Sequence, residues 1–139
     1  MKLSAAELDR HICLTGMPGA GKSWVGEELA LQLGVPWVDL DLEIELHQSK
    51  SISEIFTHYG EDYFRIIETE LLEDFLSSKV ISVISLGGGT VVSESNCGRV
   101  KESAWTVYLR AVTRGPCFVG IFGSASRSWF ESATRCTPL

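Results

Sequence analysis

The sequence contains no apolar run that approaches the ~20 residues of a membrane-spanning helix, so we expect no membrane partner. Positive charge is scarce: 12 Lys and Arg stand against 18 Asp and Glu, and the net charge of −6 argues against a nucleic-acid-binding surface. The first ten residues are polar and lack the apolar region of a secretory signal. None of the four cysteines stands in a C-x-x-C pair, and we expect reduced thiols in a cytoplasmic protein.

The composition is that of a globular domain. Hydrophobic residues make up 45% of the 139 residues and charged residues 22%, which is enough for one domain with its own core. The charge is uneven, because residues 1–110 hold 9 Lys/Arg and 17 Asp/Glu whereas residues 111–139 hold 3 Arg and one Glu. We therefore expect a core over residues 1–110 and a divergent tail over residues 111–139.

Apolar, β-branched segments alternate with helical patterns along the first 110 residues. Strands are expected near residues 11–15, 36–40, 80–86 and 104–109. Helices are expected near residues 21–33, 42–47, 53–58, 61–76 and 93–100. This order predicts an α/β three-layer sandwich, with a parallel sheet in which the first strand is central.

A further strand is possible at residues 117–122, and its pairing is restricted by chain length. Only residues 112–116 separate it from the end of the fourth strand. A parallel crossover needs at least ~10–12 residues, so this strand would be antiparallel or unpaired. An unpaired fifth segment would leave the fourth strand as an exposed edge.

Residues 16–23 read GMPGAGKS and match the phosphate-binding pattern G-x-x-x-x-G-K-[ST] without a mismatch. Backbone N–H groups of such a loop surround a phosphate chain, and the following helix directs its positive end at the phosphates. We expect Lys22 to contact the β- and γ-phosphates and Ser23 to bind Mg²⁺. A dinucleotide fingerprint would require glycine at position 24, where Trp24 stands. The predicted nucleotide-binding residues are Gly16, Pro18, Gly19, Ala20, Gly21, Lys22, Ser23 and Trp24.

Two carboxylates follow the second expected strand. Asp39 and Asp41 would project to the same side of an extended chain, beyond the carboxyl end of the sheet where ligands bind. Beside a phosphate loop they can hold hydrated Mg²⁺ and accept a proton from an attacking hydroxyl. The alternative is a charge cluster with Glu43 and Glu45 at a helix N-terminus, and residue chemistry alone favours neither.

Arg65 and the three successive glycines Gly87–Gly89 each allow two interpretations. Arg65 and Glu68 have the i,i+3 spacing of a surface salt bridge, but a fixed guanidinium can also bind a substrate carboxylate. The glycines follow the third expected strand, where they permit close approach of a ligand or form a flexible loop.

These motifs together resemble the shikimate kinase family. The phosphate loop, the Asp39-x-Asp41 pair, residues 56–68 and Gly87–Gly89 occur in that family's order and spacing, and the resemblance covers residues 10–110. It implies a P-loop kinase fold of strand order 2-3-1-4-5, with a substrate-binding insertion at about residues 42–77. It also implies transfer of the γ-phosphoryl group of ATP to the 3-hydroxyl of shikimate, a step of aromatic amino-acid biosynthesis.

The resemblance assigns roles to individual residues. Lys22 and Asp41 would be catalytic, with Asp41 as the base. Ser23 would bind Mg²⁺ directly, and Asp39 would do so through water.

The resemblance also implies the substrate contacts. Asp41 would bind shikimate hydroxyls, Arg65 would hold its carboxylate, and Gly88 and Gly89 would approach the ring. The enzyme would act as a monomer on ATP and shikimate.

The resemblance ends near residue 110. The family's lid, its second substrate arginine and its parallel fifth strand are not recognisable in residues 111–139, and Arg110 and Arg114 are the nearby basic residues. We therefore expect slow turnover. Two alternatives are a non-catalytic binder of nucleotide or shikimate and a P-loop kinase for another small polyol acid.

Overall fold

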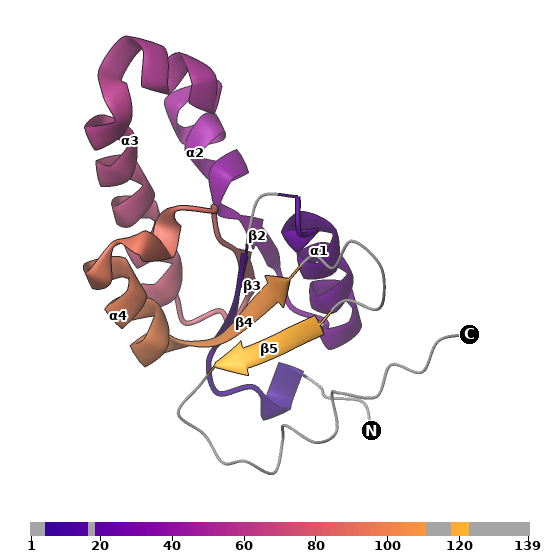
Figure 1. Ribbon diagram of the computed structural model, residues 1–139. Coiled ribbons are helices and arrows are strands. Elements are labelled where there is room, and N and C mark those ends of the chain that lie inside the picture. The colour runs from indigo at the N-terminus through magenta and orange to yellow at the C-terminus, as the bar shows by residue number, and fades with distance from the viewer. Residues whose placement is uncertain (1–4, 17–18, 111–117, 123–139) are drawn as a thin grey trace.

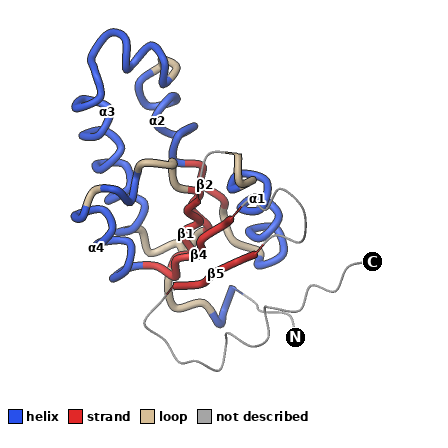
Figure 2. The backbone as a smooth tube through the Cα atoms, in the orientation of Figure 1, coloured by secondary structure: helices blue, strands red, loops and turns tan. Residues whose placement is uncertain are grey.

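The computed structural model describes residues 5–16, 19–110 and 118–122, which form one sheet with helices on both faces (Figures 1 and 2). The strands are β1 His11–Gly16, β2 Trp37–Asp39, β3 Val83–Ser85, β4 Ala104–Arg110 and β5 Phe118–Phe122. The helices are α1 Lys22–Leu33, α2 Leu40–Gln48, α3 Ile52–Ser77 and α4 Glu94–Ser103, with short 3₁₀ turns η1 Ala5–Glu7 and η2 Thr90–Val92. No helix within these described ranges is long and apolar enough to cross a membrane.

The sheet has the strand order β2-β3-β1-β4-β5. Strands β1 to β4 pair in parallel and β1 is central, which confirms the prediction of an α/β fold with a parallel sheet. Strand β5 pairs antiparallel with β4, opposing Val119 to Leu109. Of the two alternatives expected for this segment, antiparallel or unpaired, the structure has the antiparallel one, so β4 is not an edge of the described sheet. A connection too short for a crossover still permits an antiparallel return.

Apolar residues fill both interfaces between the sheet and the helices. The larger cluster joins the sheet to α2, α3 and α4, and its fully buried members include Leu40, Ile44, Ile55, Leu72 and Ile84. The smaller cluster lies between the sheet and α1 and includes Leu14, Ala30 and Val83. Figure 1 shows α1 on one side of the sheet, α3 and α4 on the other, and α2 with the start of α3 projecting beyond the strand ends.

Helix α3 contains the two helices expected at residues 53–58 and 61–76, which the non-helical Gly60 separates. It begins at a capping box in which the Ser51 hydroxyl accepts from Glu54 N–H and the Glu54 carboxylate accepts from Ser51 N–H. The boundary expected near residue 60 is a kink, because Gly60 has φ 84° and ψ 173° inside the helix. That left-handed φ is one that glycine adopts without a Cβ penalty. The aromatic pair Phe56 and Phe64, with ring centroids 4.8 Å apart, packs across the kink.

Glycine at position 26 is required by the packing of α1 on the sheet. A Cβ at Gly26 would lie 2.4 Å from Ser85 Oγ and 2.6 Å from Trp37 Nε1. We expect Gly26→Ala to lower the free energy of unfolding by about 1–3 kcal/mol, the ordinary cost of overpacking. The matched control is Gly98→Ala on α4, where a Cβ would lie within 4 Å of no atom outside its own stretch of helix. This substitution should stabilise the helix by ~0.5–1 kcal/mol. Urea unfolding of both variants checks the pair, and equal stabilities would contradict this account of the packing.

Candidate active site

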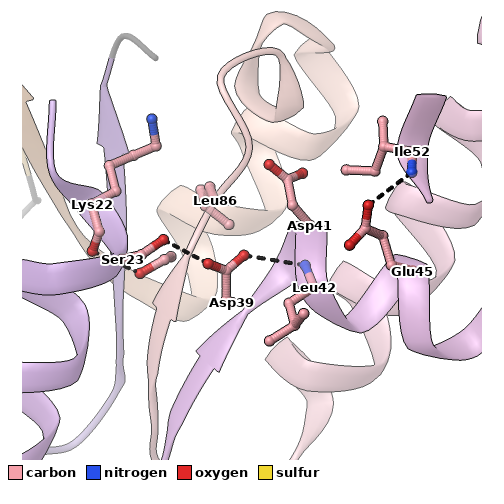
Figure 3. Close-up of a pocket in the computed structure, with 9 residues that line it drawn as sticks. Lys22, Ser23, Asp39, Asp41, Leu42, Glu45, Ile52 and Leu86 are labelled. Atoms are coloured by element: carbon pink, nitrogen blue, oxygen red, sulfur yellow. Dashed lines mark hydrogen bonds between the residues drawn. The ribbon is translucent and has the colours of Figure 1, made fainter. Parts of the chain in front are cut away.

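A cavity of about 350 Å³ opens at the carboxyl ends of β2 and β3, beside the first turn of α1. Figure 3 shows its side chains converging from α1, the end of β2, α2 and the start of α3. The lining residues are Lys22, Ser23, Asp39, Asp41, Leu42, Glu45, Ile52, Ser85 and Leu86. Four residues predicted from different sequence motifs, Lys22, Ser23, Asp39 and Asp41, therefore border one space.

The phosphate loop connects β1 to α1. Gly21 precedes the helix with φ 83° and offers no side-chain cap, so the N–H groups of the first turn face the loop without a capping side chain. Lys22 Nζ donates to the Gly16 carbonyl at 2.9 Å. Of the predicted nucleotide-binding residues, Pro18 lies outside the described residues. The Trp24 side chain is 72% exposed on the first turn of α1.

Ser23 and Asp39 are joined directly. Ser23 Oγ donates to Asp39 Oδ2 at 2.6 Å, and Asp39 Oδ1 accepts from Leu42 N–H at 3.3 Å as the N-cap of α2. Asp39 thus caps a helix, as the charge-cluster interpretation expects, and it also lies beside the phosphate loop, so the magnesium interpretation stays a prediction. The described residues contain no cluster of three or more His, Cys, Asp or Glu side chains arranged for a metal ion. A hydroxyl and a carboxylate nevertheless fit Mg²⁺, which takes one or two protein oxygens together with substrate phosphates.

Asp41 lines the cavity, but it does so from a helix and not from the end of a strand as expected. The strand alternation predicted for residues 39–41 is wrong, because β2 ends at Asp39 and Asp41 stands in the first turn of α2. Leu40 is 0% exposed and points into the core, so Asp41 still faces the cavity. Burial raises the pKa of Asp41 above the ordinary carboxyl value, and the negative charges of Asp39 and Glu68 raise it further.

Arg65 forms a partly buried ion pair. Its Nη1 donates to Glu68 Oε1 at 2.7 Å, and the Glu68 side chain is 1% exposed. The salt bridge predicted from the i,i+3 spacing is therefore present, but its Glu68 end is buried and not on the surface. Its second pair, from Nη2 to Glu61 Oε1 at 3.5 Å, is exposed. The guanidinium also lies 5.2 Å from the ring centroid of Phe64. These contacts hold the arginine in one orientation.

The triple glycine brings Arg65 and Asp41 close to the same backbone. A Cβ at Gly87 would lie 2.7 Å from Asp41 Oδ1, and a Cβ at Gly89 would lie 2.5 Å from Arg65 Nη2. Gly88 between them is exposed. Side chains at positions 87 and 89 would thus displace Asp41 and Arg65, which gives a packing reason for two of the three glycines.

The sequence did not predict several residues of the cavity wall. The sequence indicates Glu45 only as a charge at a helix end. In the structure, its Oε1 accepts from Ile52 N–H at 2.9 Å and so connects α2 to the start of α3. Ser85 donates to the Lys22 carbonyl at 3.0 Å and accepts from Trp37 Nε1 at 3.1 Å, so it fixes the start of α1. The one available signal was the position of Ser85 at the end of a strand, next to the glycine loop.

Comparison with known proteins is decisive for the family. The family model described as "Shikimate kinase" matches residues 18–114, which is most of the chain. The chain belongs to the shikimate kinase family. A shikimate kinase from Persephonella marina is 44% identical over 100 residues, covering 72% of this chain and 60% of the relative. A shikimate kinase from Alkaliphilus oremlandii is 48% identical over 102 residues, covering 73% and 60%.

Solved structures agree with this family assignment. The crystal structure of shikimate kinase from Aquifex aeolicus has a TM-score of 0.70 and 36% identity, covering 74% of this chain and 61% of that one. Shikimate kinase from Acinetobacter baumannii in complex with shikimate has a TM-score of 0.71 and 38% identity, covering 74% and 57%. This chain therefore spans about 60% of the length of the relatives that it matches.

Proposed function

We propose that this protein transfers the γ-phosphoryl group of ATP to the 3-hydroxyl of shikimate. The observation that carries the proposal is that Lys22 of the phosphate loop and the Asp41 carboxylate line one cavity. Arg65 is not in the cavity lining, but it lies against Gly89, two residues along the glycine loop from the Gly87 that borders Asp41. Related shikimate kinases from several bacteria support this substrate pair, and one of them is known in complex with shikimate. These names do not favour a kinase for a different polyol acid.

The nucleotide end of the site would be formed by residues 16–24. Backbone N–H groups of the loop and of the first turn of α1 would surround the phosphates, and Lys22 would neutralise charge on the β- and γ-phosphates. Ser23 and Asp39 would hold Mg²⁺, Ser23 directly and Asp39 through water. When bound, Mg²⁺ would offset the negative charge of the transferring phosphoryl group.

The acceptor end would be formed by Asp41, Arg65 and the glycine loop. Asp41 would bind shikimate hydroxyls and take the proton of the 3-hydroxyl as general base, a role favoured by its raised pKa. Arg65 would bind the substrate carboxylate through the part of its guanidinium not used by Glu68. Gly88 and Gly89 would let the ring hydroxyls approach the backbone.

The larger arrangement follows from this assignment. Residues 42–77 would form the substrate-binding insertion on the core of residues 1–110, and residues 111–139 would form the divergent tail. We also propose that the protein is a monomer. Among the described residues, Cys13 and Cys97 are free thiols, which supports a reducing, cytoplasmic location. The alternative function is a non-catalytic binder of nucleotide or shikimate, because the family's lid motif is not recognisable in residues 111–139.

Replacement of Arg65 by lysine tests the acceptor end of the site. Lysine keeps the positive charge but loses the planar fork that pairs with a carboxylate. We expect Arg65→Lys to weaken shikimate binding by about 10–150-fold, the equivalent of one lost hydrogen bond to a charged group. Isothermal titration calorimetry with shikimate measures the change. Mg-ATP binding is the internal control and should be unaffected.

The matched control variant is Arg99→Lys, on α4, which has an ion pair of its own with Glu73. It should bind shikimate as the wild type does. Unchanged shikimate affinity in Arg65→Lys would show that Arg65 is a structural ion-pair partner and not a substrate contact.

A further inference from the structure

Thr90 lies directly after the triple glycine, and the proposed mechanism gives it no role. Its side chain is 0% exposed in the turn η2. The Thr90 hydroxyl donates to Glu68 Oε2 at 2.8 Å, while Glu68 Oε1 accepts from Arg65 Nη1 at 2.7 Å. The two oxygens of one buried carboxylate thus join Thr90 to Arg65.

The backbone of Thr90 is held on both sides. Its N–H donates to the Gly87 carbonyl at 3.2 Å, and its carbonyl accepts from Asn96 Nδ2 at 3.1 Å. Asn96 is itself 1% exposed in the first turn of α4. A hydroxyl on a fixed backbone can direct its hydrogen bond to one acceptor, and here that acceptor is Glu68 Oε2.

The hydroxyl donor stabilises the Glu68 carboxylate, because the Asp41 carboxylate lies nearby. The Cβ position of Gly87 is 2.7 Å from Asp41 Oδ1 and 3.3 Å from Glu68 Oε2, so both carboxylates border the same small space. Arg65 neutralises one oxygen of Glu68, and the Thr90 hydroxyl satisfies the other. Without that hydroxyl, a desolvated oxygen facing Asp41 would favour rotation of the Glu68 carboxylate away from Arg65.

We propose that Thr90 is a positioning residue, which acts through Glu68 to fix the Arg65 guanidinium for a substrate carboxylate. The inference rests on the proposed function of Arg65. Position 90 therefore requires a hydroxyl: serine preserves the positioning, whereas valine, of nearly the same shape, abolishes it.

The test compares Thr90→Val with Thr90→Ser by calorimetric titration of the full chain with shikimate and, separately, with Mg-ATP. We expect Thr90→Val to weaken shikimate binding about tenfold, the size of the effect of losing one hydrogen bond to a charged group. Thr90→Ser should stay within about twofold of wild type, and neither variant should change Mg-ATP binding. Equal shikimate affinity in valine and serine variants would overturn the proposal, as would equal losses for both ligands.

A second measurement separates this inference from the proposed function. Nuclear magnetic resonance of the Arg65 Nη groups, assigned by Arg65→Lys, reports how freely the guanidinium rotates without any ligand. We expect slow rotation in wild type and Thr90→Ser and faster rotation in Thr90→Val, or in Thr90→Ala where valine unfolds the chain. Failure of wild type to bind shikimate would refute the function alone, whereas unchanged Arg65 rotation in the variants lacking the hydroxyl would refute the positioning role.

Discussion

Replacement of Lys22 by alanine is expected to weaken Mg-ATP binding by about 100-fold or more and to abolish phosphoryl transfer. Lys22 lines the cavity at the first turn of α1, and its Nζ lies 2.9 Å from the Gly16 carbonyl at the start of the phosphate loop. In the proposed site, its ammonium group would contact the β- and γ-phosphates. Because the side chain ends in the cavity and not in the core, the fold should be retained, with a stability change within about 1 kcal/mol.

Calorimetric titration with Mg-ATP measures this effect. Lys101→Ala is a suitable control, since it removes the same charge from an exposed position on α4, across the sheet from α1. Wild type and Lys101→Ala should bind alike. Equal ATP affinity in wild type and Lys22→Ala would refute the assignment of residues 16–23 as the nucleotide site.

Replacement of Asp41 by asparagine is expected to lower kcat about 10²–10⁴-fold and, at the same time, to stabilise the protein at pH 7. Loss of a general base accounts for the first effect. The second follows from the raised pKa of Asp41, which results from burial and from the charges of Asp39 and Glu68. The folded protein then binds a proton at Asp41 more tightly than the unfolded chain does, so the ionised carboxylate destabilises the fold.

Because the pKa of Asp41 is raised in the folded protein, the stability gained by Asp41→Asn depends on pH. The stability that protonated Asp41 provides is complete below its unfolded pKa, near the ordinary value of 3.8, and is lost as pH rises through the raised pKa of the folded protein. Asparagine is neutral throughout, so Asp41→Asn should exceed wild type in stability at pH 7 and lose that advantage below about pH 4. Urea unfolding across this range measures it, with exposed Asp74→Asn as control. A destabilised Asp41→Asn at pH 7 would mean that the carboxylate is a structural partner.

Local sequence chemistry was sufficient to predict the phosphate loop and a parallel sheet with the first strand at its centre, whereas the full strand order was implied only by the family resemblance. The pattern around Lys22 requires a strand before it and a helix after it, and β1 and α1 satisfy both. The central place of β1 was predicted because its loop must reach a site shared by both flanks.

The start of α2 and the surroundings of Glu68 depend on tertiary packing, which the sequence alone does not show. The pattern at Asp39 and Asp41 resembled a continuing strand, but Asp39 caps α2 and the helix begins at Leu40, two residues earlier than expected. The pairing of Arg65 with Glu68 was visible in their spacing. The hydrogen bond that the buried Glu68 accepts from Thr90, 22 residues away in the chain, was not. No local pattern contains such a contact, because it forms only when α3 packs against the turn that follows β3.

The pairing of β5 with β4 was open for a similar reason. Chain length between the segments excluded a parallel crossover, but it did not distinguish an antiparallel partner from an unpaired segment. Predictions that concern Arg114 lie outside the described residues, and the expectation that residues 111–139 supply no lid stays a prediction.

The most direct test of the account is shikimate-dependent ADP release from ATP by the purified 139-residue chain, measured beside its Asp41→Asn variant. We expect wild type to release ADP only when shikimate is present, at a rate at least ~10²-fold below that of a full-length family member, as for loss of one strong electrostatic stabiliser. The Asp41→Asn variant should show no shikimate-dependent release above background. ADP release that is independent of shikimate, or equal in wild type and Asp41→Asn, would contradict the proposal that this site phosphorylates shikimate.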